Sequence, residues 1–267
     1  MHTATHVTAE EPRDPTDVIR TAMEGTSHVL SAALEAGVRR VIITSSIATI
    51  GYGQNHTSGV RRYTEENWTD LDNMRWKWAY CIGKTQAERQ AWDYANANDI
   101  GLTTIHPGMI LGPPLDTDAG VSIGLISGLL SGNPPAYPDL GFSLSDVRDV
   151  ADMHVAALEN DAAIGQRYLC TTSYLHFSRI ADMLRAAYPD APVPSRAVPD
   201  WLMRILVHWL RDIRQVINDI GNEKHFDGSK GRALLGRDYR PAEDTIRDSA
   251  ESLYALGLVP VPKRKKK

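Results

Sequence analysis

The stretch 38–51, VRRVIITSSIATIG, decides how this chain folds. Its β-branched run 41–43 is continuously apolar, which is typical of a strand buried on both faces of a parallel sheet. The hydroxyl cluster 44–46 follows directly. Before the strand, the segment 15–36 carries apolar residues at helical spacing and stops at Gly37. A helix followed by a buried strand is the alternation that builds parallel α/β sheets.

The same alternation continues along the chain. After an irregular stretch at 51–78, good helix formers and apolar repeats predict a helix over 79–98, and a β-rich run then ends at Pro107 and Gly108. Further patterns predict a strand at 165–170, helices near 120–131, over 146–159 and over 242–256, and two helical segments within 173–216. The chain is therefore expected to be an α/β protein.

The composition is that of a globular enzyme of ordinary solubility. The chain has 267 residues, of which 42% are hydrophobic and 23% charged, and its net charge is −4. This charge gives no reason to expect a nucleic acid or an anionic membrane as partner. Two cysteines, Cys81 and Cys170, argue against a disulfide scaffold, and neither a membrane-length apolar run nor a secretory signal is visible. We expect a cytoplasmic protein that acts on a small molecule.

Tyr80 and Lys84 form the first candidate site. They lie four residues apart in the predicted helix 79–98, so the phenol and the ammonium share one helix face. A nearby cation favours the phenolate form of a tyrosine, and such a pair could supply a proton to a substrate oxygen. The alternative is a chance spacing on a solvated helix face, and the bare motif does not decide between the two.

Ser46 is the second candidate, because it ends the strand that opens this section. Open parallel sheets place their chemistry outside the carboxyl ends of their strands, where a serine hydroxyl can donate to a carbonyl oxygen. A hydroxyl that caps local backbone is the alternative interpretation. No metal site is expected, since the spacing of His2 and His6 in a strand-to-loop segment does not bring two imidazoles together.

Seven stretches, considered together, are more specific than any of these motifs alone. They run over nearly the whole chain: HTAT (2–5), EGTSHVLSAALEAGVRRVIITSSIATIG (24–51), EENWTD (65–70), AYCIGKTQAE (79–88), HPGMILGPP (106–114), DVRDVADMHVAALE (146–159) and SKGRALLGRDYRPAEDTIRDSAESL (229–253). Together they resemble the extended short-chain dehydrogenase/reductases of the NAD-dependent epimerase/dehydratase superfamily. Within these, the chain is similar to the branch of dihydroflavonol reductases, cinnamoyl-CoA reductases and bacterial aldehyde reductases.

The resemblance implies a role for each candidate. Tyr80 would be the general acid in carbonyl reduction, and Lys84 would hold the nicotinamide ribose and lower the pKa of Tyr80. Ser46 would hydrogen-bond the substrate oxygen, because hydride addition builds negative charge there. The resemblance also implies a cofactor, NADP or NAD with NADPH preferred. Its site would be lined, besides Tyr80 and Lys84, by Ala4, Thr44, Ser45, Pro107, Gly108, Met109 and Ile110.

The sequence departs from the family at its start. The G-x-x-G-x-x-G turn that binds the pyrophosphate is not found, and His2 to Ala4 correspond to the end of the family's fourth strand. We therefore expect a partial Rossmann-type doubly wound parallel sheet whose first strands are missing, with weakened cofactor binding. A monomer or homodimer is expected, with self-association through the open sheet edge as a further possibility.

The resemblance also suggests a division into regions. Residues 1–111 and 146–172 would form the incomplete dinucleotide-binding domain. Residues 112–145 and 173–262 would form a smaller, mostly helical substrate-binding region, and 263–267 a basic tail.

The resulting hypothesis is an NAD(P)H-dependent oxidoreductase that reduces an aldehyde or ketone. A sugar-nucleotide epimerase or dehydratase of the same superfamily is the close alternative, because it would use the same three side chains. A catalytically silent remnant or interaction module is another. A serine hydrolase using Ser122 of the G-x-S-x-G match at 120–124 is disfavoured, because the preceding LDTDA is too polar for the buried strand that this motif needs.

Overall fold

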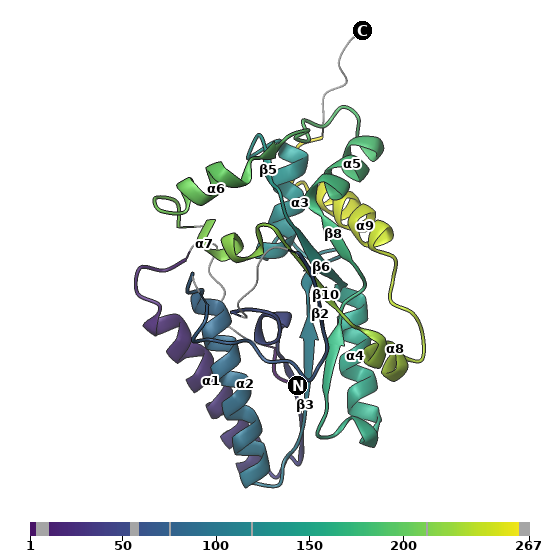
Figure 1. Cartoon of the computed structure of the whole chain (residues 1–267). Helices are drawn as coiled ribbons and strands as arrows, with labels where there is room; N and C mark the ends of the chain where they lie inside the picture. Colours follow the sequence, from purple (N-terminus) through teal and green to yellow (C-terminus); the bar gives the residue numbers. More distant parts are fainter. Residues whose placement is uncertain (4–10, 54–58, 75, 119, 212, 262–267) are drawn as a thin grey trace.

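A computed structural model describes residues 1–3, 11–53, 59–74, 76–118, 120–211 and 213–261. Its centre is a parallel sheet of three strands in the order β1-β3-β7 (Figure 1). These strands are β1 (Arg40–Thr44), β3 (Gly101–Pro107) and β7 (Arg167–Cys170). Thr44 pairs with Ile105 and Pro107 with Cys170, so the carboxyl ends of the three strands lie at one edge of the sheet. His2 adds a parallel bridge to Ile43.

Two helices cover one face of this sheet. They are α1 (Thr16–Glu35) and α2 (Ala79–Ala97), which lie side by side in Figure 1. The buried residues of α1 recur every four positions, at Val18, Ala22, Thr26 and Leu30, so one stripe of the helix faces inward. Leu30 and the other apolar side chains of this layer pack against Ile43 and its neighbours in β1 and β3.

The two helices approach closely because α2 carries a glycine at the contact. A Cβ at Gly83 would lie only 3.3 Å from both the Ala22 Cβ and the Ile19 Cα of α1. Such contacts are tighter than packed interiors tolerate without movement, so the absence of a side chain at this position sets the spacing of the helix pair.

The opposite face is covered by α4 (Val147–Glu159), beside which lies α8 (Ser229–Leu235). Met153 of α4 packs on Ile42 and Ile105 of the sheet. The arrangement of helices, sheet and helices gives three layers, and this confirms the α/β class with a Rossmann-type parallel sheet that the sequence predicted.

The second half of the chain builds another layer pair. Its main sheet has the order β4-β6-β8, formed by β4 (Met109–Leu111), β6 (Gly141–Asp146) and β8 (Tyr174–His176). Against it pack the helices α3 (Val121–Ser131), α5 (Phe177–Ala187) and α9 (Ala242–Ala255), which share the largest apolar cluster. The remaining helices are α6 (Asp200–Leu206) and α7 (Ile213–Val216), with 3-10 turns η1 (Ile47–Thr49), η2 (Asp161–Ala163) and η3 (Ile217–Asp219).

Two short strand pairs were not foreseen from the sequence. In one, β2 (Gly59–Tyr63) pairs with β10 (Asn222–Phe226); in the other, β5 (Tyr137–Pro138) pairs with β9 (Ala197–Val198). Four of the five residues of β2 are exposed, so its sequence lacks the apolar alternation from which a strand could be predicted. The pair β2–β10 joins segments 163 residues apart (222 minus 59), which ties the second half of the chain to the loop before α2.

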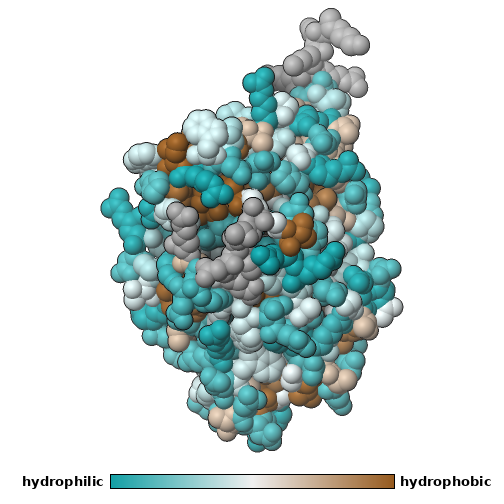
Figure 2. All heavy atoms as spheres, in the orientation of Figure 1, coloured by the Kyte–Doolittle hydropathy of each residue, from teal (hydrophilic) through white to brown (hydrophobic). Residues whose placement is uncertain are grey.

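The surface in Figure 2 is mostly hydrophilic, with separate apolar patches. One lies at the upper left, over the place where Figure 1 shows α6. Trp201 of α6 is 64% exposed, and Trp209, which follows α6, is 72% exposed. Among the described residues, no helix combines the length and the apolar character that crossing a membrane requires.

Candidate active site

Ser46, Tyr80 and Lys84 are brought together from two elements. Ser46 follows β1 and caps η1, where its hydroxyl accepts a hydrogen bond from the Ala48 N–H at 3.1 Å. Tyr80 stands in the first turn of α2, close enough for the Ser46 side chain to affect its pKa. Lys84 follows one turn later and donates to the Thr44 carbonyl at 2.7 Å. The structure thus shows Ser46 capping local backbone, and its donation to a substrate oxygen stays a prediction.

The electrostatics of Tyr80 differ from what the sequence suggested. Burial raises the pKa of Tyr80 above its usual value, and the hydrogen bond with Ser46 opposes that shift. Lys84 is not among the groups that shift this pKa, and its ammonium donates to the Thr44 carbonyl. The lowering of the pKa of Tyr80 by Lys84 stays a prediction. Tyr80 is a protonated phenol at neutral pH, which is the form that can give up a proton.

Lys84 is itself strongly affected by its surroundings. Burial lowers the pKa of Lys84 to about 8, and the negative charge of Glu88 acts in the opposite direction. An ammonium group has three donors, and the Thr44 carbonyl accepts one of them. Within the part of the chain that the structure describes, the other two donors have no acceptor and suit further oxygen atoms.

Aromatic rings surround the phenol on its other side. The Trp78 ring lies 5.3 Å from the Tyr80 ring and 5.3 Å from the Tyr52 ring, measured between centroids. Tyr52 is held in turn by the buried pair of Asp219 and Lys224, whose ammonium is 3.3 Å from the Tyr52 ring centroid. Residues of η3 and β10 thus support the wall of the site from the far end of the chain.

The residues expected to line the cofactor site take different positions. The Thr44 side chain contacts His154 Nε2 at 2.7 Å, and the Ser45 hydroxyl donates to Glu88 rather than facing Tyr80. Pro107 and Gly108 lie at the carboxyl edge of the central sheet, near the level of Ser46. Met109 and Ile110 follow in β4, where both are partly buried and pair with β6. Ala4 lies outside the described residues.

A Cβ at Gly108 would lie 2.1 Å from the Ser143 carbonyl oxygen, so a side chain at this position is excluded by backbone. Gly108 is therefore required for the packing of the strand end, whatever else it contacts.

A buried cluster behind the site was missed in the sequence. It is centred on Glu88, which accepts a hydrogen bond from Arg167 Nε at 2.9 Å and lies 3.3 Å from His106 Nε2. Burial by itself would raise the pKa of Glu88, but the His106 and Arg167 contacts and the Ser45 hydroxyl lower it well below its usual value. The available signal was a glutamate four residues after Lys84, on the same face of a helix.

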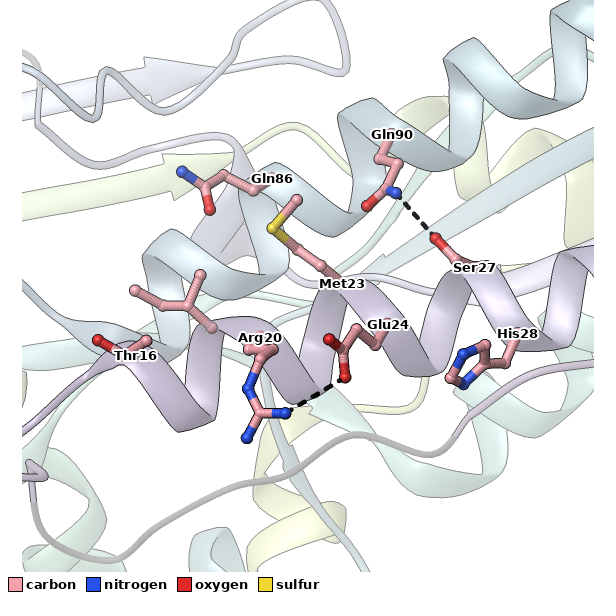
Figure 3. Close-up of a pocket in the computed structure, with 9 residues that line it drawn as sticks. Thr16, Arg20, Met23, Glu24, Ser27, His28, Gln86 and Gln90 are labelled. Carbon is pink, nitrogen blue, oxygen red and sulfur yellow. Dashed lines mark hydrogen bonds and ion pairs between the residues drawn. The ribbon is translucent and has the colours of Figure 1, made fainter.

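A groove is hollowed between α1 and α2, and Tyr80 is not among the residues that line it (Figure 3). It measures about 490 Å³, and its wall from α2 is formed by Gln86 and Gln90, of which Gln90 donates to Ser27 Oγ at 2.8 Å. Residues two positions along a helix point to different faces, so this groove does not open onto Lys84 or Glu88. It is not the site of the chemistry discussed here.

The hydrolase motif finds no support. Ser122 lies in the first turn of α3, and the nearest preceding strand, β4, ends at Leu111. A nucleophile elbow needs a strand that turns directly into the helix, which the described residues between Gly112 and Asp118 do not form.

With this geometry in place, comparison with known proteins is decisive for the family. The profile of the NAD dependent epimerase/dehydratase family matches residues 1–170. The chain belongs to this family. Cinnamoyl-CoA reductase 2 from Medicago truncatula is 32% identical over 263 residues, which are 98% of this chain and 71% of the relative. Anthocyanidin reductase ((2S)-flavan-3-ol-forming) from Vitis vinifera is 33% identical over 210 residues, 73% of this chain and 61% of the relative.

Solved structures of this family agree. Yeast methylglyoxal/isovaleraldehyde reductase Gre2, complexed with NADPH, matches with a TM-score of 0.76 and 25% identity over 97% of this chain and 77% of that one. Vestitone reductase from alfalfa (Medicago sativa L.) matches with a TM-score of 0.71 at 22% identity, over 97% of this chain and 76% of that one, which supports the fold alone. The predicted resemblance to the reductase branch of the epimerase/dehydratase family is confirmed.

Proposed function

We propose that this chain is an NADPH-dependent oxidoreductase that reduces an aldehyde or a ketone, with Tyr80 as the proton donor. The observation that carries the proposal is that Ser46 and Tyr80 lie close together at the carboxyl edge of the sheet, with Lys84 one helical turn away. Support also comes from the relatives, since those named above are all reductases and Gre2 was solved with NADPH.

The residues present suit the nicotinamide end of such a cofactor. The two free donors of Lys84 match the hydroxyl oxygens of a ribose, which act as acceptors. We assign Lys84 to that diol and the strand ends at Thr44 and at 107–110 to the surrounding wall. When bound, the reduced nicotinamide supplies the hydride for the carbonyl carbon.

The side chains of this family member then handle the proton. As negative charge develops on the carbonyl oxygen, the Ser46 hydroxyl stabilises it by hydrogen bonding and Tyr80 transfers its phenolic proton to it. The raised pKa of Tyr80 keeps the proton on the phenol until that charge appears. Ser46, which lowers the pKa of Tyr80, stabilises the phenolate that remains.

The rest of the substrate is assigned to the second half of the chain, at 112–145 and 173–262. Two contacts favour this assignment. Asn218 Nδ2 donates to the Trp76 carbonyl at 3.0 Å, and the Trp76 ring lies 5.4 Å from the His208 ring. Segments of that half therefore border the loop that leads into Tyr80.

The test is a direct one. The purified chain is titrated with NADPH while tryptophan emission is followed, since Trp78 adjoins Tyr80. It is then mixed with NADPH and a panel of aliphatic and aromatic aldehydes and ketones, and NADPH consumption is recorded. We expect saturable quenching and consumption that depends on the carbonyl compound. A chain that shows no saturable quenching up to millimolar NADPH would refute the proposal.

A further inference from the structure

Glu88 carries a negative charge in the interior, one helical turn beyond Lys84. Its side chain is only 1% exposed. The donors around it come from four elements: the Ser45 hydroxyl after β1, Thr104 Oγ1 of β3 at 3.3 Å, Trp92 Nε1 of α2 at 3.3 Å and Arg167 Nε of β7 at 2.9 Å. A buried carboxylate is tolerated only when it is paired and hydrogen-bonded in this way. These contacts therefore keep Glu88 ionised.

The same contacts fix where the charge lies. Arg167 also donates to the Asn67 carbonyl at 2.8 Å and lies over the Trp68 ring, 3.9 Å from its centroid. His106 Nδ1 is 3.2 Å from the Ser46 carbonyl oxygen. The partners of Glu88 are thus themselves held, and they fix the carboxylate in position in the interior.

That neighbour is Lys84. Residues four apart on a helix share a face, and both side chains here are buried, so little water screens them from each other. The other described groups near Lys84 are Tyr80, one turn earlier on α2, the Thr44 carbonyl of β1, and His2, whose pKa is lowered by burial and by Lys84. Of the described neighbours of Lys84, Glu88 is the one with a negative charge.

We propose that Glu88 is a positioning residue of the active site, whose charge keeps the buried Lys84 in its ammonium form at neutral pH. This inference rests on the proposed function only for the use that is made of the ammonium. Burial removes hydration from Lys84, and the carboxylate replaces part of what is lost. Without Glu88, Lys84 would be an uncharged amine near neutral pH and a poorer donor to a ribose.

The experiment measures the titration of Lys84 itself. Lysine labelled with ¹³C at Cε is incorporated, the Lys84 signal is assigned with Lys84→Arg, and its chemical shift is followed from pH 6 to pH 11. We expect a midpoint of about 8 in the wild-type chain and a midpoint lower by roughly one pH unit or more in Glu88→Gln. Asp93→Asn, which neutralises an exposed carboxylate on the same helix, is the matched control and should leave the midpoint unchanged.

Two further variants separate charge from shape. Glu88→Asp keeps the charge, so its midpoint should stay near that of the wild type; a midpoint as low as that of Glu88→Gln would contradict the proposal. If Glu88→Gln fails to fold because Arg167 is left unpaired, Glu88→Gln combined with Arg167→Gln leaves no lone charge between them. The lowered midpoint must then appear in that pair.

An unchanged midpoint in folded Glu88→Gln, or in the pair, overturns the inference. These titrations need neither NADPH nor turnover. A chain that binds no cofactor would therefore refute the proposed function and leave the inference about Glu88 standing or falling on its own result.

Discussion

Two neighbouring turns of α2 place polar side chains in surroundings that favour opposite charge states. In the turn that carries Tyr80 and Lys84, burial shifts both pKa values toward the uncharged form, and among the described residues Lys84 has one hydrogen-bond partner, the Thr44 carbonyl. One turn later, Glu88 is surrounded by donors that keep it charged. The first arrangement leaves a proton and two donors available to a reagent, whereas the second fixes a charge permanently. We call the turn with Tyr80 and Lys84 the reactive turn. The turn with Glu88, whose charge is fully paired, is the saturated turn.

The largest expected effect tests the reactive turn. Tyr80→Phe removes the phenolic proton and should lower carbonyl reduction by about 10²–10⁴-fold, the usual contribution of a positioned acid. The measurement is the initial rate of NADPH consumption. Tyr94→Phe removes a hydroxyl from the same helix away from the site and serves as control. Full activity in Tyr80→Phe would exclude Tyr80 as the donor.

A substitution in the saturated turn should instead lower the free energy of unfolding. Glu88→Ala leaves Arg167 and His106 without their carboxylate and should reduce the free energy of unfolding by about 3–5 kcal/mol. Asp93→Ala, exposed on the same helix, should change it by no more than about 0.5 kcal/mol. Urea unfolding of both variants makes the comparison. Equal effects would mean that the cluster around Glu88 is not a source of stability.

The pH dependence of that loss has a definite sign. The pKa of Glu88 is lower in the folded chain than its ordinary value of 4.5, so its contribution is complete above that value and is lost progressively as the pH falls from there toward the lower pKa of the folded chain. The difference in the free energy of unfolding between the wild type and Glu88→Ala should therefore become smaller at acidic pH.

A third prediction concerns the pH profile of reduction. Lys84 is charged below its pKa of about 8 and neutral above it, while the pKa of Tyr80 is raised, so Lys84 loses its proton first. The rate should decline as the pH rises through about 8, approaching tenfold per unit. The onset of the decline should move to lower pH in Glu88→Gln. A profile that stays flat up to pH 10 would mean that the charge of Lys84 is not used.

The smallest effect compares two buried serines. The Ser45 hydroxyl donates to the charged Glu88, whereas the Ser143 hydroxyl donates to the neutral Lys224 carbonyl at 2.9 Å. Hydrogen bonds to charged groups contribute about 1.5–3 kcal/mol and neutral ones about 0.5–1.5 kcal/mol. Ser45→Ala should therefore destabilise the chain more than Ser143→Ala in urea unfolding. The reverse order would contradict the view that the Glu88 turn is the more tightly held.

Much of the fold could be predicted where a repeating pattern is visible. The β-branched run 41–43 and the four-residue spacing in 15–36 correspond to β1 and α1, because burial on a regular element leaves a regular trace. The strands β2 and β6 are two of those that were missed, and they show why. The first is exposed, and the second, GFSLSD, mixes apolar residues with serines that are buried through hydrogen bonds to distant carbonyls.

The site was predictable to a similar extent. Ser46, Tyr80 and Lys84 could be named because each stands beside a recognisable strand end or helix, and the family to which they pointed is confirmed. Their roles and the line of cofactor residues stay predictions. Arg167 could not have been found, since its link to Glu88 joins residues 79 positions apart and depends on the pairing of β7 with β3. The shift in the pKa of Tyr80 depends on how the surrounding residues bury it, which no sequence motif reveals.

The close contact at Gly83 has a consequence for the whole site. Gly83 directly precedes Lys84, and what limits its approach is the backbone of Ile19 and the methyl group of Ala22 in α1. The position of α2, which bears the reactive groups, is therefore limited by packing against residues that take no part in the chemistry. Enlarging Ala22 would displace Lys84 without touching it. A substitution at Ala22 of α1 would thus change the geometry of the site, although α1 contributes no catalytic residue.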